Sequence, residues 1–385
     1  MLILVFLSLI IWLYLVFFRG KFWLNDQFLE TIATEKSPKQ IKITAIIPAR
    51  DEAESIGQCL KSLFEQDYNG EFNIVLIDDR SEDNTKEIAL QTAKECDKEK
   101  QLTIVDGEPL EKGWSGKLWA MHQGIKWAES NLQSDYFLFT DADILHSKNN
   151  LSSLVVKAEK ENLDLVSLMV KLNCESFWEK MLIPAFIFFF QKLYPFPLVN
   201  QAKSNVAAAA GGCILIEQGA LSRIGGVKTL RTALIDDCTL ATLVKRSKAD
   251  DRGIWLGLTN DTFSLRDYDR LEPIWNMVAR TAFTQLNYSN LLLLGTVIGM
   301  FITYLIAPIG LVWGLIIFNK SLILASLATY FLISLSYFPT IKFYQLGWWY
   351  CLMLPFIALL YNFMTIDSAL RHWQGKGGQW KGRVY

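Results

Sequence analysis

The sequence contains few histidines and no closely spaced cysteines. Its three histidines stand far apart in 385 residues, and no two of its six cysteines form a Cys-x-x-Cys pair. This distribution excludes the usual histidine and cysteine metal clusters and a disulfide framework, and it is typical of reduced cysteines in a cytosol-facing protein. No basic block stands out and the formal net charge is -1, which argues against a nucleic-acid partner.

Apolar residues are abundant and form four long segments. Hydrophobic residues make up 51% of the chain, and the segments cover 1–18, 291–318, 322–338 and 348–366. The first has no basic region before it and no small-residue cleavage site after it, so we expect an uncleaved N-terminal transmembrane anchor. Arg19 and Lys21 follow it, which predicts a multi-pass protein of the cell inner (plasma) membrane with the next domain in the cytosol.

The basic tail, residues 367–385, leaves the number of membrane crossings open. Arg371, Lys376, Lys381 and Arg383 predict a cytosolic tail. Three full crossings by the C-terminal transmembrane segments 291–366 would instead leave the tail outside. Pro308 interrupts the 28-residue segment 291–318, so one crossing could be a re-entrant or split pair.

Residues 40–290 alternate strand and helix patterns, as an α/β domain does. Short β-branched apolar runs predict strands at 43–47, 72–77, 102–105 and 136–140, and apolar residues at helical spacing predict helices at 54–64 and 84–96. The connections are long enough to join parallel strands. Ligands of such sheets bind beyond the carboxyl ends of the strands, so polar residues there are the candidate site residues.

Two carboxylates one residue apart follow the fourth predicted strand. Asp141 and Asp143 would point to the same side of an extended backbone, and the small Ala142 between them would leave room for a ligand. Carboxylate oxygens favour Mg²⁺ or Mn²⁺, either of which can neutralise a diphosphate leaving group. An isolated Asp-x-Asp is more often ordinary turn chemistry, so the interpretation depends on the neighbouring motifs.

Polar residues also follow the first two predicted strands. The first ends in Pro48-Ala49-Arg50-Asp51-Glu52 and the second in Asp78-Asp79-Arg80-Ser81-Glu82-Asp83. We interpret Ser81 and Asp83 as helix N-caps. Asp79, at the end of its strand, could instead accept hydrogen bonds from a nucleobase or from ribose hydroxyls.

A glycine-containing segment offers a further phosphate-binding candidate. Gly113-Trp114-Ser115-Gly116-Lys117 provides backbone donors and one cation, which suits a diphosphate. The segment lacks the spacing of a Walker loop, so Gly116 and Lys117 are weak candidates when taken alone.

The stretch 177–199 is unusually aromatic for the interior of an α/β domain. It contains Phe186-Ile187-Phe188-Phe189-Phe190, and five consecutive bulky apolar residues exceed one face of a soluble helix. We expect an interfacial insert that brings a lipid hydroxyl to the site, with Phe188 and Phe189 contacting the acceptor. A soluble core helix is the alternative.

The motifs together resemble family 2 glycosyltransferases with the GT-A fold. The resemblance rests on Pro48 to Glu52, Asp78 to Asp83, Asp141-Ala142-Asp143 and Ile235-Asp236-Asp237, in that order. Within that family the chain is similar to the hopanoid-associated (hopene-associated) glycosyltransferases. That closer similarity is carried by Gly113 to Ala120, Cys174 to Glu179, Ala207 to Cys213, Ala279 to Gln285 and Trp380 to Arg383.

The resemblance implies an α/β fold: a GT-A, Rossmann-like nucleotide-sugar-binding domain between the anchor and the C-terminal transmembrane helices. It also implies roles for single residues. Asp237 would be the general base and Asp236 would lie toward the acceptor. Asp143 would be the principal metal ligand, and Asp141 would contact the ribose or a metal-bound water. The nucleotide-sugar pocket would be lined by Pro48, Ala49, Arg50, Glu52, Asp79, Gly116, Lys117, Asp141, Ala142 and Asp143. Without the family pattern, Asp236 and Asp237 read equally well as a helix N-terminus.

One motif departs from many processive or lipid-directed relatives, which carry Gln/Arg-x-x-Arg-Trp after the base. Here Met277, Arg280 and Thr281 occupy the comparable positions. The departure argues against polymer synthesis. Arg280 is a diphosphate candidate, although an interfacial anchor is an equally good reading.

The expected function is membrane-bound, inverting transfer of a sugar from a nucleotide-sugar donor, with UDP as the first choice of carrier, to a membrane lipid. A hopanoid is the first choice of acceptor, and ceramide, a glycerolipid, a carotenoid or a polyprenyl phosphate are alternatives. A transporter or flippase is less favoured because the apolar segments lack internal charges. A nucleotidyltransferase or glycosidase of related fold is a further alternative.

Overall fold

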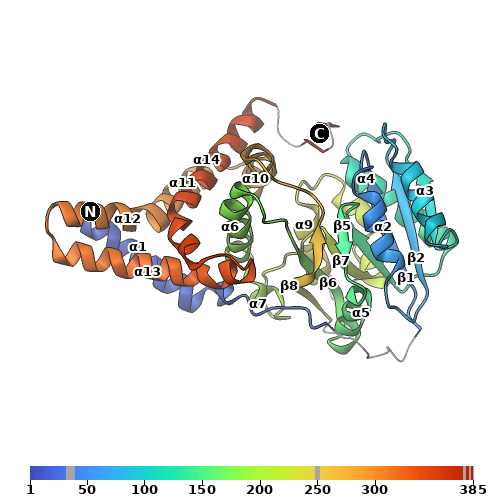
Figure 1. The fold of residues 1–385 in the computed structure, drawn as a ribbon, viewed down its shortest axis with the longest axis horizontal. Helices are drawn as coiled ribbons and strands as arrows, with labels where there is room; N and C mark the ends of the chain where they lie inside the picture. The colour runs from blue at the N-terminus through green and yellow to red at the C-terminus, as the bar shows by residue number, and fades with distance from the viewer. Residues whose placement is uncertain (32–39, 248–251, 376–378, 381–382, 385) are drawn as a thin grey trace. The chain divides into compact units, whose positions relative to one another are not determined.

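The computed structural model describes residues 1–31, 40–247, 252–375, 379–380 and 383–384 (Figure 1). The chain divides into two compact units. The sheet unit contains residues 27–173, 198–267 and 379–385, and the helical unit contains residues 1–26, 174–197 and 268–378. Within the predicted range 40–290, residues 174–197 and the end of the range, 268–290, group with the apolar helices.

The sheet unit contains an eight-stranded mixed sheet. Its strands are β1 (Ile43–Ala49), β2 (Phe72–Asp78), β3 (Leu102–Asp106), β4 (Tyr136–Thr140), β5 (Ile144–His146), β6 (Leu163–Lys171), β7 (Cys213–Glu217) and β8 (Gly253–Ser264). The order is β3-β2-β1-β4-β7-β6-β8-β5. The four predicted strands are confirmed and pair in parallel, whereas β7 runs antiparallel to both β4 and β6.

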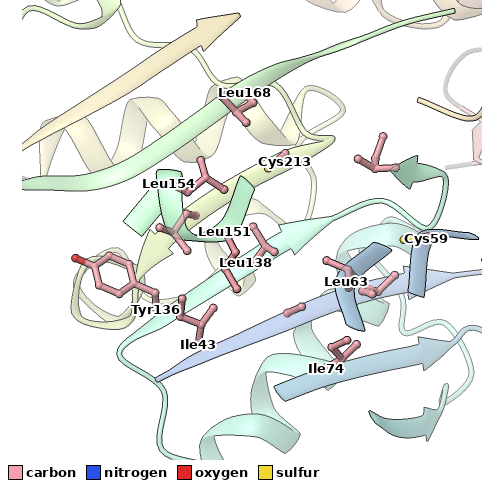
Figure 2. Packing of buried hydrophobic residues seen from close by; sticks show 14 of the residues in the cluster. Ile43, Cys59, Leu63, Ile74, Tyr136, Leu138, Leu151, Leu154, Leu168 and Cys213 are labelled. Carbon is pink, nitrogen blue, oxygen red and sulfur yellow. The ribbon is translucent and has the colours of Figure 1, made fainter. Parts of the chain in front are cut away.

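Helices cover both faces of this sheet. They are α2 (Ile56–Phe64), α3 (Thr85–Glu95), α4 (Gly116–Asn131), α5 (Asn150–Lys160), α8 (Gln218–Arg223) and α9 (Asp236–Arg246), with a 3₁₀ turn at Val227–Leu230. All seven residues of β1 are buried, as expected for a strand covered on two sides. Figure 2 shows Ile43, Ile74 and Leu138 of three adjacent strands in one core cluster with Leu63 of α2 and Leu154 of α5.

The helical unit contains most of the long apolar segments. Its helices are α1 (Leu2–Phe18), α6 (Phe177–Leu193), α10 (Leu271–Gln285), α11 (Asn290–Met300), α12 (Ile306–Ile316), α13 (Lys320–Phe343) and α14 (Leu354–Trp373), with 3₁₀ turns at Phe22–Leu24 and Trp348–Met353. The short α7 (Phe196–Val199) falls at the boundary between the units. Two short antiparallel strands near the C-terminus, β9 (Gln379–Trp380) and β10 (Arg383–Val384), belong to the sheet unit.

Within the described residues, four helical stretches are long and apolar enough to cross a membrane: 177–199, 290–316, 320–343 and 348–373. The α1 helix is apolar but shorter, with 17 residues. The predicted segment 291–318 is not one regular helix, since a π-helical turn, Phe301–Leu305, separates α11 from α12. Pro308 lies just after that turn, and its missing N–H removes a normal helical hydrogen bond there.

Candidate active site

A cavity opens at the carboxyl ends of β1 and β4, where the N-termini of α4 and α9 also meet. Its empty volume is about 370 Å³, including space open to solvent. Helix N-termini favour anionic ligands. The lining residues are Pro48, Lys117, Leu118, Met121, Phe139, Thr140, Asp141, Gly211, Ile214, Val227, Leu230, Asp236, Asp237 and Leu240.

Lys117 links the two carboxylate motifs of this cavity. It lies in the first turn of α4, which Ser115 caps by accepting from the N–H of Leu118. Its Nζ is 2.5 Å from Oδ1 of Asp141. Burial would lower the pKa of Lys117, but the carboxylates of Asp141, Asp236 and Asp237 raise it above its ordinary value. The lysine is therefore a permanent cation between the two acidic motifs.

Asp237 is held in place by two backbone N–H groups. Gly211 donates to its Oδ2 at 3.0 Å and Cys238 donates to its Oδ1 at 2.7 Å. Asp236 and Asp237 lie in the first turn of α9, so the prediction that they occupy a helix N-terminus is confirmed. Both also line the cavity, so that position is compatible with a role in the site. Burial and the neighbouring Asp236 carboxylate raise the pKa of Asp237 to about 6.

The Asp141–Asp143 segment differs from the sequence prediction in its backbone. It is a turn between β4 and β5 rather than an extended strand end, because β5 leaves β4 to pair with β8. Ala142 is 2% exposed and packs in the core cluster, so its small side chain serves packing rather than ligand access. The two carboxylates are near enough that Asp141, after burial, helps to raise the pKa of Asp143 to about 6.

The carboxylates of Asp141 and Asp143 suit a divalent cation that binds together with a phosphorylated ligand. Among residues 1–31, 40–247 and 252–375, no three His, Cys, Asp or Glu side chains form a metal-binding group. Mg²⁺ commonly binds through one or two carboxylates together with substrate phosphates. Asp141 and Asp143 fit that requirement, whereas they do not fit a closed structural site.

The other predicted nucleotide-pocket residues lie at the ends of β1 and β2. Asp79 is fully buried, and its N–H donates to the carbonyl of Ala49 at 2.8 Å. Arg50 donates through Nη1 to the carbonyl of Asp79 at 2.9 Å, so this arginine supports the loop after β2. Glu52 lies on the same side, where Oε2 accepts from Ser55 at 3.3 Å.

Three predicted site residues belong to the helical unit. Phe188 is fully buried and Phe189 is 9% exposed, and their rings contact Phe22, Tyr304, Tyr337 and Tyr361. Acceptor contact by these two residues stays a prediction, and their burial does not favour it. Arg280 is exposed on α10, and its diphosphate role also stays a prediction.

Sequence reasoning missed residues that the fold brings to the site. Arg266 follows β8, and its Nε is 3.1 Å from Oδ2 of Asp143. Gly211 supplies the N–H that orients Asp237. Behind the site, His146 contacts Thr140 and Asn150, each at 2.9 Å, and burial lowers its pKa to about 4. Gly211 lies in the stretch Ala207 to Cys213 that carries the closer resemblance, but no local motif gives any of these residues its role. The roles depend on distant pairings within the sheet.

Comparison with known proteins agrees with this architecture. Residues 44–225 match the sequence family described as Glycosyl transferase family 2. An uncharacterized protein of Methanocaldococcus jannaschii, MJ0544, is 32% identical over 122 residues, which span 32% of this chain and about half (49%) of the relative.

The similarity to solved structures concerns the fold. The mannosyltransferase PcManGT from Pyrobaculum calidifontis, solved with GDP-Man and Mn²⁺, superimposes with a TM-score of 0.55 at 16% identity, covering 97% of each chain. TarS residues 1–349 of S. aureus, solved with UDP, gives a TM-score of 0.40 at 15% identity over 89% of this chain and 95% of the other. The first similarity supports the GT-A fold, and the second is too weak to carry an argument.

Proposed function

We propose that this chain, which carries a family 2 glycosyltransferase domain, transfers a sugar from a nucleoside diphosphate donor to a lipid hydroxyl with inversion at the anomeric carbon. The observation that carries the proposal is a single cavity lined by Asp141, Lys117 and Asp237. It combines a carboxylate that can face a metal-bound diphosphate, a fixed cation and a carboxylate whose pKa is raised.

Each of these groups has a task in such a reaction. A divalent cation held by Asp143 and Asp141 would neutralise charge on the leaving diphosphate. Lys117 and the N-terminus of α4 add positive potential on the same side of the cavity. Asp237 accepts the proton of the acceptor hydroxyl as the bond to the anomeric carbon forms, and its raised pKa makes it a better base than an ordinary aspartate.

The acceptor is proposed to be a membrane lipid, with a hopanoid as the first choice. Four helical stretches long enough to cross a membrane support a membrane acceptor, as do large apolar side chains exposed on the helical unit, such as Ile3, Leu291 and Phe318. The hopanoid assignment rests on the motif resemblance, as does UDP as carrier. PcManGT, solved with GDP-Man, makes a GDP-linked donor the second choice.

The test compares lipids extracted from cells that express the protein, the Asp237→Asn variant or neither. We expect a glycosylated lipid, detected by mass spectrometry, only with the unaltered protein. A glycosylated ceramide, glycerolipid, carotenoid or polyprenyl phosphate would replace the hopanoid assignment and keep the reaction. Free sugar without a glycolipid, or a sugar nucleotide moved across vesicle membranes without turnover, would overturn the proposed transferase.

A further inference from the structure

Both carboxylates of the proposed metal pair already contact a cation of the protein. Lys117 Nζ is 2.5 Å from Asp141 Oδ1, and Arg266 Nε is 3.1 Å from Asp143 Oδ2. Arg266 also reaches Glu52, with Nη2 3.6 Å from Oε1. A divalent cation would bind through the same two carboxylates, so its binding competes with these two side chains for their negative charge.

The backbone next to Arg266 is anchored to the metal pair. Ile144, directly after Asp143, pairs with Ser264 at the end of β8, and Leu265 donates its N–H to the carbonyl of Asp143 at 2.7 Å. The Arg266 side chain is 44% exposed, whereas that of Lys117 is 22% exposed and faces three carboxylates. Of the two cations, Arg266 can leave its carboxylate more easily without moving the backbone.

We propose that Arg266 neutralises Asp143 while no metal is bound and moves to the donor diphosphate when a divalent cation takes its place. The inference rests on the proposed function, since it assumes a donor diphosphate at this metal pair. A guanidinium matches phosphate oxygens through paired N–H groups. One side chain thus opposes metal binding in the absence of nucleotide and favours nucleotide binding once the metal is present, so the two ligands bind cooperatively.

The experiment measures binding rather than turnover, with the full-length protein in detergent. Mn²⁺ binding without nucleotide is followed by electron paramagnetic resonance, and binding of UDP and of GDP is measured with saturating Mn²⁺. Arg266→Gln is compared with the unaltered protein and with Arg270→Gln. Arg270 follows Arg266 closely in the sequence, and its side chain is 76% exposed and pairs with Asp269. Asp143→Asn identifies the Mn²⁺ signal that belongs to this site.

We expect opposite signs in Arg266→Gln. Mn²⁺ alone should bind at least threefold more tightly, because its competitor is gone, and the nucleoside diphosphate should bind at least threefold more weakly. If Arg266 only holds Glu52 and Asp143 in place, Arg266→Gln would weaken the binding of both Mn²⁺ and the nucleoside diphosphate. That outcome, or an unchanged Mn²⁺ affinity, overturns the proposal. If neither nucleotide binds to any variant, the proposed function fails, while the Mn²⁺ arm still decides whether Arg266 opposes metal binding.

Discussion

At the scale of single residues, Asp237 has both carboxylate oxygens oriented by backbone N–H groups, from Gly211 and Cys238. An asparagine can place an acceptor oxygen toward only one of them. We therefore expect Asp237→Asn to lose transfer by about 10²–10⁴-fold, as for removal of a general base, and to lose slight stability. Single-turnover assays with saturating donor measure the first effect, and thermal unfolding measures the second.

Nucleotide affinity is the internal control for that variant. Asp237 is oriented by the backbone N–H groups of Gly211 and Cys238, whereas Lys117 makes its ion pair with Asp141. Asp237→Asn leaves that ion pair intact, so donor affinity should change by less than about threefold, a shift of about 0.7 kcal/mol. A collapse of donor affinity with normal turnover of the bound complex would show that Asp237 binds donor and that the base lies elsewhere.

The pH profile should report the same carboxylate. Burial and Asp236 raise the pKa of Asp237 to about 6, and only the ionised form accepts a proton. The value of kcat/KM should therefore rise tenfold per pH unit below about pH 6 and level off above it. In Asp236→Asn the like charge is absent, so the break should move to lower pH. Measurements at saturating Mn²⁺ would contradict this assignment if both profiles were flat from pH 5 to 7.

At the scale of secondary-structure elements, the end of β3 lies unusually close to the end of β2. A Cβ atom on Gly107 would lie 2.8 Å from the carbonyl oxygen of Asp78 and 2.9 Å from Cα of Asp79. Backbone atoms cannot rotate away, so Gly107→Ala must separate the two strand ends, at a cost of about 1–3 kcal/mol. We expect lower unfolding temperature and weaker nucleotide binding, because Asp79 moves.

Gly299→Ala is the matched control for Gly107→Ala. Gly299 lies inside α11, where an added Cβ would meet no atom within 4 Å, and alanine favours a helix over glycine by up to about 1 kcal/mol. The unfolding temperature of Gly299→Ala should equal or exceed that of the unaltered protein. Equal effects of the two substitutions, measured by thermal unfolding in the same detergent, would refute the close approach as the cause.

The α6 helix has a packed middle and an exposed start. Phe188 is fully buried between Phe22 and Tyr337, whereas Phe177 is 63% exposed. Phe188→Ser removes a core ring, and we expect it to destabilise the helical unit by about 3–5 kcal/mol. Phe177→Ser should leave the unfolding temperature within about 2 °C, since surface substitutions rarely exceed 0.5 kcal/mol. If Phe188→Ser is as stable as Phe177→Ser and loses only lipid transfer, an acceptor role for Phe188 is supported instead.

The four parallel strands were predictable because each is a short apolar run, rich in β-branched or aromatic residues, that polar residues follow, such as Asp79 after β2 and Asp141 after β4. The position of β7, antiparallel between β4 and β6, could not be predicted, since strand direction depends on connections far along the chain. The Asp141 and Asp237 motifs were visible as local carboxylate pairs. Arg266 was hidden, because its place beside Asp143 depends on the pairing of β5 with β8.

At the scale of the whole molecule, the helical unit offers an answer to the question of the basic tail. In this unit α1, α12 and α13 lie side by side, and α12 turns directly into α13 (Figure 1). The α14 helix packs mainly against α10 and α11 and touches α13 only slightly. With 17 and 24 residues, α1 and α13 are about 26 and 36 Å long, against a hydrocarbon core of about 30 Å. The third crossing is the 27-residue stretch 290–316, which ends in α12. Three crossings without α14 are compatible with a cytosolic tail.

We therefore expect the turn between α12 and α13 to face the outside of the cell and the end of α14 to face the cytosol. Phe318 in that turn is 88% exposed, and Gln374 follows α14 in an exposed position. A membrane-impermeant maleimide should label Phe318→Cys in intact cells. It should label Gln374→Cys only after permeabilisation, like Lys160→Cys in the sheet unit. The unaltered protein is the blank, because four of its six cysteines are buried and two are partly buried. Labelling of Gln374→Cys in intact cells would mean that α14 also crosses, and labelling of Lys160→Cys there would reverse the orientation that Arg19 and Lys21 indicate.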